Sequence, residues 1–347
     1  MRRVTMKRNL WPRRLAIPSV VLATAGALLG TGFASPGRES APRAMNILLM
    51  GTDERNTITA AEKREFHAGG HPCGCTDVLM LVHVSARRDR VSVIGLPRDS
   101  YAEIPPYRDE ASGQERPPHP AKINAAFQEG GPELAVRTIE SMTGVSVDRY
   151  VQLDFRRFMD GVDDVGGVEV CTPRRLKDSA TKLDLPPGKH RLGGGRALQY
   201  VRSRHVDGSA DLGRIQRQQR FLVQALRRAQ SAKVLADPGR TGYLVRTLLG
   251  SGPQGFSVGE LAELAGALRG LPSSATEFTT VPISGFAPPE AGVGSALTWD
   301  RRRADELFAR IREDRPLVAK GTQPAPKDPP DILGTTTPVR GSAYACR

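Results

Sequence analysis

Short apolar runs separated by polar turns recur along the chain from residue 45 onward. The first three are rich in aliphatic and β-branched residues and have the length of strands, at 45–50, 78–84 and 90–96. A polar tetrapeptide at 86–89 divides the second run from the third, which predicts a hairpin. Further short runs predict strands at 150–153, 168–171 and 277–283.

Apolar residues at helical spacing lie between these strands. Ala135, Ile139 and Met142 follow Pro132, which predicts a helix that begins near this proline. Comparable patterns predict helices at 155–162, 197–200, 211–229, 258–268 and 304–311. Residues 185–195 contain several Pro and Gly residues and are predicted to form a loop. Strands that alternate with helices predict an α/β fold.

Charged residues sit where several of the predicted strands begin or end. Asp53 follows the first strand, Asp77 precedes the second, and Arg98 and Asp99 follow the third. If the first two strands run antiparallel, the hairpin brings all these positions to one edge of the sheet. Acids and arginines at one edge predict a metal-assisted site for a phosphorylated substrate.

A second charged group follows the short helix at 197–200. Arg202 and Arg204 are two residues apart, which places both side chains on one face of an extended segment. On the predicted helix at 211–229, three polar residues fall in one line beside the apolar stripe: Asp211, Arg214 and Gln218. The arginine and glutamine of this line are predicted to reach a pocket. Arg217 points away from it and is interpreted as part of a solvated charged face.

The overall charge indicates an anionic partner. The formal net charge is +13, from 50 Lys and Arg residues against 37 Asp and Glu residues. Nucleic acid, a lipid headgroup and a phosphorylated substrate all fit this balance. With 347 residues, of which 39% are hydrophobic, the chain can form one sizeable core plus extensions.

The N-terminus predicts the compartment. Residues 1–14 contain six basic residues and no acid, and residues 15–37 contain no charged residue. A segment of this length can cross a bilayer as a helix, and its basic flank keeps the first end in the cytoplasm. We interpret 15–37 as a retained signal-anchor. A cleaved signal peptide is the alternative, because the segment ends in small residues. Either topology places the body outside the cytoplasm and argues against nucleic acid as a partner.

Four cysteines fit an exported protein, in which disulfides are the usual state. Three pairings are possible. Because Cys73 and Cys75 are separated by one residue, we expect one of them to bond to Cys171 and Cys346 to hold the tail. A zinc site is the alternative, since the two neighbouring cysteines are preceded by two further candidate ligands, His67 and His71.

Seven segments resemble, in order, the sequence blocks of the LytR-CpsA-Psr family. They lie at 46–53, 76–81, 96–101, 122–127, 164–170, 197–204 and 211–218. The resemblance implies a membrane-anchored phosphotransferase that moves a glycopolymer from an undecaprenyl-pyrophosphate carrier to peptidoglycan and releases undecaprenyl phosphate. It also implies an α-β-α sandwich with a central mixed β-sheet, preceded by an N-terminal transmembrane helix, and assistance by Mg²⁺.

The resemblance assigns roles to individual residues. Asp53 and Asp77 match the metal-binding acids, and Mg²⁺ commonly takes one or two carboxylates together with phosphate oxygens. The residues implied in pyrophosphate binding are Arg98, Lys122, Arg202, Arg204, Arg214 and Gln218. Those implied in catalysis are Arg98, Asp99, Arg202 and Arg204. Arginine suits these roles because its planar guanidinium donates paired hydrogen bonds to phosphate oxygens.

The chain is expected to divide into five segments. A cytoplasmic basic segment (1–14), the signal-anchor (15–37) and a linker (38–44) precede an extracytoplasmic domain (45–316). Within that domain the sequence blocks occupy 46–229 and a C-terminal extension 230–316, and a flexible Pro/Thr-rich tail follows at 317–347. Three other functions stay open: a polyprenyl-pyrophosphate hydrolase, a noncatalytic polyprenyl-lipid binding protein and a transcription attenuator. The predicted topology disfavours the attenuator, and the oligomeric state is left open.

Overall fold

The computed structural model describes residues 43–70, 73–206, 210–250, 255–319 and 337–346. The chain divides into two units, Met1–Ala41 and Pro42–Arg347, and the described residues all belong to the second. The predicted cytoplasmic segment and signal-anchor therefore lie outside the described residues. Within the described ranges, no helix combines the length and the apolar character needed to span a membrane.

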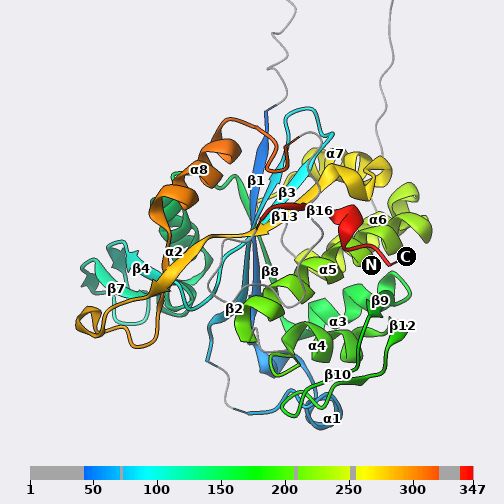
Figure 1. Cartoon of the computed structure of the whole chain (residues 1–347), viewed down its shortest axis with the longest axis horizontal. Helices are drawn as coiled ribbons and strands as arrows, with labels where there is room; N and C mark the ends of the chain where they lie inside the picture. The colour runs from blue at the N-terminus through cyan, green and yellow to red at the C-terminus, as the bar shows by residue number, and fades with distance from the viewer. Residues whose placement is uncertain (1–42, 71–72, 207–209, 251–254, 320–336, 347) are drawn as a thin grey trace, which may run out of the picture. The chain divides into compact units, whose positions relative to one another are not determined.

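A six-stranded mixed sheet forms the centre of the described unit (Figure 1). In sheet order its strands are β16 (Val339–Arg340), β13 (Thr276–Thr280), β3 (Val91–Gly95), β2 (Thr76–Val84), β1 (Met45–Thr52) and β8 (Arg149–Leu153). β1 runs antiparallel to β2 and parallel to β8, while β13 runs parallel to β3. The predictions of a mixed sheet and of a hairpin between β2 and β3 are confirmed.

Polar side chains begin many of the helices. Five helices start at a residue whose side chain accepts a hydrogen bond from the backbone three residues on: Thr59, Asp154, Asp237, Ser257 and Asp300. The α-helices of the described residues are α1 (Ala60–Glu65), α2 (Ala125–Thr143), α3 (Phe155–Asp164), α4 (Gly194–Arg202), α5 (Ala210–Ser231), α6 (Pro238–Leu249), α7 (Val258–Gly270) and α8 (Arg301–Arg312).

Helices cover both faces of the sheet because both faces are apolar. Successive residues of a strand point to opposite faces. Leu48 and Met50 of β1 join a buried cluster with residues of α2 and α8. Ile47 of the same strand joins a separate cluster that includes residues of α5 and α7. Figure 1 shows α2 and α8 on one side of the sheet and α5 and α7 on the other.

One predicted helix has an extra part before it, and one predicted loop differs. The helix predicted to begin near Pro132 is the second part of α2: the backbone of Gly130 and Gly131 is not helical, with a φ of 67° at Gly131, and the helix resumes at Pro132 after a shorter part that begins at Ala125. The predicted loop at 185–195 contains β12 (Gly188–Leu192), which pairs with β9 (Val168–Thr172) in a separate two-stranded ribbon. A Gly-containing segment forms this strand because β9 supplies its hydrogen-bond partners, and such partners cannot be read from composition.

Shorter ribbons complete the described unit. β4 (Tyr101–Ile104), which follows β3 in the chain, pairs with β7 (His119–Lys122). The other two-stranded ribbons join β5 (Tyr107–Arg108) to β6 (Glu115–Arg116), β10 (Leu176–Lys177) to β11 (Asp184–Leu185), and β14 (Ile283–Phe286) to β15 (Leu297–Trp299).

The predicted flexible tail at 317–347 is wrong for its described parts. The backbone N–H groups of Leu317 and Val318 donate to the fully buried carboxylate of Glu277, at 2.9 and 3.1 Å. Further on, β16 pairs with the edge of β13. A buried acid and an open strand edge therefore hold these segments. Neither partner is close in sequence, so the local Pro and Thr content gave no sign of them.

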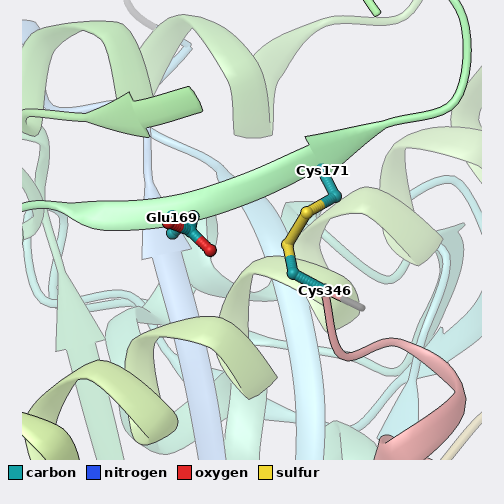
Figure 2. A group of neighbouring side chains, drawn as sticks. All are labelled: Glu169, Cys171 and Cys346. Carbon is teal, nitrogen blue, oxygen red and sulfur yellow. A yellow bond between two sulfur atoms is a disulfide. The ribbon is translucent and has the colours of Figure 1, made fainter. Parts of the chain in front are cut away.

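The cysteines pair differently from the prediction. Cys73 bonds to Cys75, and Cys171 of β9 bonds to Cys346 (Figure 2). Gly74 turns the backbone sharply between the first pair with a φ of 62°, which lets residues two apart meet. The expected link from this loop to Cys171 is wrong, whereas Cys346 does tie the C-terminal segment to the body.

The disulfides also occupy cysteines that could otherwise bind a metal ion. The first pair consumes two of the four ligands of the zinc alternative, and His71 lies outside the described residues. Among the described residues, the one group of three potential ligands close enough to share an ion is Glu169, Cys171 and Cys346. The sulfurs of Cys171 and Cys346 form a disulfide (Figure 2), so neither is free to bind an ion. Neither group therefore supports a metal site.

The two disulfides should differ in their contribution to stability. Cys171–Cys346 closes a separation of 175 residues and Cys73–Cys75 one of two. Because a cross-link restricts the unfolded chain more when its loop is longer, Cys346→Ser should lower the free energy of unfolding by roughly 2–5 kcal/mol. Urea unfolding measures this, with Cys73→Ser/Cys75→Ser as the matched control. Equal losses in the two variants would contradict the expectation.

Candidate functional site

A cavity of about 510 Å³ lies between one face of the central sheet and helices α3, α4 and α5. Much of its wall is apolar and comes from β1, β2 and these helices: Leu49, Met80, Phe155, Phe158, Leu198 and Leu222. Charged residues from the ends of β1 and β2 and from the segments around α4 and α5 line it as well. One cavity therefore combines an apolar wall with a charged group.

The structure brings Asp53 and Asp77 into this cavity from neighbouring strands. β1 and β2 pair antiparallel up to Gly51, where the register shifts before Thr52. Beyond that shift, the backbone N–H of Asp53 donates to the carbonyl of Cys75 at 3.1 Å. The chain between Asp53 and Asp77 therefore forms a loop whose two ends lie side by side, and both acids line the cavity.

Asp77 faces three guanidinium groups. Arg98 donates a short hydrogen bond to its Oδ1, and Arg204 Nη2 and Arg214 Nη1 lie 3.6 and 3.9 Å from the same oxygen. Burial by itself would raise the pKa of Asp77, but the charges of Arg214, Arg98 and Arg204 outweigh burial and hold the pKa below its ordinary value. Asp77 is therefore ionised and a weak base.

Asp211 joins the same three arginines. Its carboxylate lies 2.8 Å from Arg214 Nη2, 3.2 Å from Arg204 Nε and 3.8 Å from Arg98 Nε. The helix pattern placed Asp211 in line with Arg214 but gave it no role of its own. In the structure Asp77 and Asp211 together hold the three guanidinium groups side by side despite their mutual repulsion. We call these five residues the ion-pair cluster.

Asp99 and Lys122 extend the cluster. Asp99 Oδ2 lies 3.5 Å from Arg98 Nε, and Asp99 Oδ1 lies 3.3 Å from Lys122 Nζ. Lys122 is the last residue of β7, and Asp99 follows β3. The structure therefore connects both predicted residues to Arg98.

Two arginines are largely withdrawn from water. The Arg214 side chain is 3% exposed, and burial lowers its pKa to about 10. Arg202 ends α4 with its guanidinium 5.0 Å from the centre of the Phe155 ring. Burial, and then the nearby charge of Arg55, lower the pKa of Arg202. Partly desolvated guanidinium groups interact strongly with an anion that enters the same space.

Of two polar neighbours on α5, one lies as predicted and the other does not. Gln218 lines the cavity as expected, and its amide donates to the carbonyl of Val201 at 3.1 Å. Arg217 was interpreted as solvated, which is wrong: it is 3% exposed and donates to the carbonyl of Ser203. Helix phasing correctly placed Arg217 on a different face of α5 from Arg214 and Gln218. It could not reveal that the segment after α4 covers this face.

Two site residues were missed from the sequence. Arg55 pairs with Asp53 through two bonds, Nε to Oδ1 at 2.6 Å and Nη2 to Oδ2 at 2.9 Å. Asp178 lines the cavity although its side chain is almost fully buried. The spacing of Arg55 two residues after Asp53 was a usable signal. Nothing local marked Asp178, which lies in the turn between β10 and β11.

Comparison with known proteins agrees with this architecture. The sequence pattern of the LytR_cpsA_psr family matches residues 34–311, which is most of the chain. The chain belongs to the LytR-CpsA-Psr family. The resemblance of the seven sequence segments is thereby confirmed.

Relatives and solved structures of the family give its context. The chain is 35% identical to the probable cell wall biosynthesis protein LcpB of Corynebacterium glutamicum, over 86% of this chain and 68% of that protein. It is 26% identical to the polyisoprenyl-teichoic acid–peptidoglycan teichoic acid transferase TagU of Oceanobacillus iheyensis, over 78% and 75%.

Two structures of family members share the fold. Bacillus subtilis TagV superposes with a TM-score of 0.60 at 22% identity, over 79% of this chain and 99% of that one. The family protein YwtF (TagT) from the same organism, with bound octaprenyl pyrophosphate lipid, gives 0.54 at 22% identity, over 79% and 91%. At this identity the likeness supports the α/β fold with its central mixed sheet.

Members of this family that use Mg²⁺ would need oxygen ligands, and the donors of this chain fit such an ion. Asp53 and Asp77 are carboxylates that line one cavity, and Mg²⁺ is usually held by one or two carboxylates plus phosphate oxygens and water. Asp53 is paired with Arg55, and Asp77 with the arginines of the ion-pair cluster. To bind the ion, each acid would give up a contact with a guanidinium group.

Loss of Asp77 should destabilise the fold in a pH-dependent way. Asp77→Asn leaves three guanidinium groups with one counter-charge fewer, at a cost of about 1–3 kcal/mol in the free energy of unfolding at pH 7. Because the folded pKa of Asp77 lies below the unfolded value of 3.8, its stabilisation is present above pH 3.8 and is lost as the pH falls further.

Urea unfolding of the wild type and Asp77→Asn at pH 7 and pH 3 measures this. The difference between the two proteins should shrink at pH 3. Asp160→Asn is the matched control, because Asp160 is more exposed and pairs with a single arginine on the helix surface, Arg156. A penalty that stays the same at both pH values would contradict the assignment.

Proposed function

We propose that this protein transfers a glycopolymer from an undecaprenyl-pyrophosphate-linked donor to peptidoglycan and releases undecaprenyl phosphate. The observation that supports this most is one cavity whose apolar wall leads to a group of guanidinium side chains. A prenyl diphosphate has the same two parts, an apolar chain and a doubly phosphorylated head. The relatives named as teichoic acid transferases support the same reaction.

The charge balance of the cavity suits the diphosphate. Six cationic side chains interact with four carboxylates: Arg55, Arg98, Lys122, Arg202, Arg204 and Arg214 with Asp53, Asp77, Asp99 and Asp211. Within this set the positive charges outnumber the negative charges by two. Asp154 and Asp178 also line the cavity, but their carboxylates are engaged by Arg157 and by backbone N–H groups. Phosphate oxygens would compete with the carboxylates for the guanidinium groups, as in other arginine-lined phosphate sites.

The reaction proceeds by in-line attack on the phosphorus that carries the sugar. A peptidoglycan hydroxyl oxygen forms the new P–O bond, the bond to the bridging oxygen of the pyrophosphate breaks, and undecaprenyl phosphate leaves with that oxygen. Arg98, Arg202 and Arg204 bind the phosphate oxygens and stabilise the charge that develops on them. Asp99, held between Arg98 and Lys122, is positioned at the edge of this group as a candidate proton acceptor.

Asp53 and Asp77 are the residues that would hold Mg²⁺ in the proposed site. The ion would supply a further positive charge for the phosphoryl group and its leaving oxygen. The two hydrogen bonds from Arg55 fix the orientation of the Asp53 carboxylate before the ligand enters.

The proposed location is the outer face of the cell membrane. The signal-anchor at 15–37 would hold the protein in the membrane with residues 1–14 in the cytoplasm. The transferase domain would then lie outside, where both a lipid-linked glycan and peptidoglycan are within reach. The disulfides fit an oxidising compartment.

Two rival activities use the same cavity. A hydrolase would break the donor pyrophosphate with water, and a noncatalytic carrier would bind the lipid without breaking it. A transcription attenuator would need contact with nucleic acid in the cytoplasm, which the proposed topology excludes. The first two are distinguished by following the fate of the donor.

Transfer can be measured with the full chain in detergent. With a synthetic polyprenyl-pyrophosphate glycan, peptidoglycan and Mg²⁺, glycan should become attached to the peptidoglycan. Arg98→Ala should lower the transfer rate at least about 100-fold, because it removes a donor to the phosphate charge in the transition state. Removal of Mg²⁺ with EDTA should lower it as well.

The alternatives predict other results in the same assay. Lipid release that proceeds equally without peptidoglycan, with no attachment, would indicate a hydrolase. Binding without release would indicate a carrier. Asp160→Asn, which changes a surface ion pair, should transfer glycan at the wild-type rate.

The apolar wall can be tested by filling it. Leu222 lines the cavity from α5, whereas Leu226, one turn further on, is a partly buried residue of the same helix that packs in the core. Leu222→Trp should weaken binding of octaprenyl monophosphate about tenfold or more, because the larger ring occupies the space of the prenyl chain. Leu226→Trp is the control. Isothermal titration that shows equal binding in both variants would contradict the cavity as the lipid site.

A further inference from the structure

The Asp178 carboxylate accepts hydrogen bonds from four backbone N–H groups. Oδ1 accepts from Ala180 and Thr181, both at 2.8 Å, within its own turn. Oδ2 accepts from Arg204 at 2.7 Å and from His205 at 2.8 Å, some 26 residues along the chain. One side chain therefore joins the turn between β10 and β11 to the segment that follows α4.

The environment of Asp178 is unusual for a turn residue. Its side chain is buried, so its charge is removed from water. Burial would raise the pKa of Asp178, but the N–H donors outweigh burial and lower the pKa to about 2. Four backbone N–H groups thus stabilise the ionised carboxylate, with a His205 ring nitrogen 3.6 Å away, and losing an acceptor oxygen would leave buried N–H groups unpaired.

The segment after α4 is held on its other side too. Ser203, fully buried, lies 3.0 Å from Thr181 Oγ1, and its hydroxyl donates to the carbonyl of Gln199. Gln199 in turn donates to the carbonyl of Thr181 at 2.9 Å, and Arg217 donates to the carbonyl of Ser203. The backbone between Arg202 and Arg204 is therefore fixed by a buried polar network.

This network bears directly on the proposed pyrophosphate site. The side chain of Arg204 extends from this backbone to Asp77 and Asp211, and its guanidinium is the most exposed of the three in the ion-pair cluster. An exposed, long side chain is positioned mainly by where its backbone starts. Phosphate recognition by guanidinium depends on such placement within a fraction of an ångström.

We infer that Asp178 is a positioning residue that sets the backbone of Arg204 for recognition of the donor's second phosphate. This inference rests on the proposed function, since it assumes a lipid diphosphate in the cavity. Although Asp178 lines the cavity, both of its carboxylate oxygens are taken by backbone N–H groups, so it is assigned no direct contact with the ligand. It acts through Arg204, and a purely structural role would instead affect stability without changing which headgroup is preferred.

Asp178→Asn separates these roles. The amide keeps one acceptor oxygen and places an NH₂ group where the second oxygen stood, so one pair of backbone N–H groups loses its acceptor. Full-length protein in detergent is titrated with octaprenyl diphosphate and octaprenyl monophosphate, and the affinity ratio of the two is measured. The wild type should prefer the diphosphate, and Asp178→Asn should reduce that preference about tenfold, as the loss of one charge-assisted contact would.

The double variant tests whether the effect passes through Arg204. Arg204→Ala should reduce the same ratio, and Asp178→Asn/Arg204→Ala should reduce it no further, because both changes remove one contact. Asp237→Asn is the matched control, since Asp237 is also an acid that accepts a backbone N–H, at the start of α6. The Asp237→Asn variant should bind octaprenyl diphosphate and monophosphate with the same affinity ratio as the wild type.

The possible results are distinct. An unchanged ratio in Asp178→Asn, or additive effects in the double variant, would overturn the inference. Asp178→Glu gives a second check if Asp178→Asn unfolds, because it keeps the carboxylate but shifts it by one methylene, and it should also lower the ratio. If the wild type binds neither lipid, the proposed function fails instead.

Discussion

The structure depends on a cluster in which two carboxylates hold three guanidinium groups together. Asp77 and Asp211 each lie within ion-pair distance of Arg98, Arg204 and Arg214. The three guanidinium groups repel one another, and that of Arg214 has almost no contact with water that could screen the repulsion. The arrangement persists because the acids come from different elements, β2 and α5, and the packing of α5 against the sheet brings them together. A site that concentrates positive charge therefore requires the fold that surrounds it.

The apolar wall beside the cluster strengthens the attraction between its guanidinium groups and an anion. Guanidinium groups beside Leu198, Phe155 and Leu222 face a less polar surrounding than groups on an open surface, so each contact with an anion is stronger. The same wall offers an environment for a prenyl chain. A ligand with a charged head and a long apolar tail satisfies both parts at once, whereas a free sugar phosphate would leave the wall exposed to water. The cavity therefore fits the lipid pyrophosphate of the proposed function.

Local sequence patterns predicted the elements that carry the site. The strands β1, β2 and β3 and the helix α5 were predicted because their apolar periodicity is strong. The ends of the strands located Asp53, Asp77 and Arg98, and the phase of the helix located Arg214. What failed depends on partners distant in sequence. The pairing of Cys171 with Cys346, the strand β16, the burial of Arg217 and the place of Asp178 each require knowledge of which segments pack together. Spacing along the chain carries no such information.

A crystal structure of the full chain with octaprenyl diphosphate would test the central claim most directly. We expect the prenyl chain along the apolar wall beside Phe155 and Leu222, with phosphate oxygens within hydrogen-bond distance of Arg202, Arg204 and Arg214. At least one ion pair to Asp77 should then be replaced by a phosphate contact. A diphosphate bound elsewhere, with all the ion pairs of the cluster unchanged, would contradict the account.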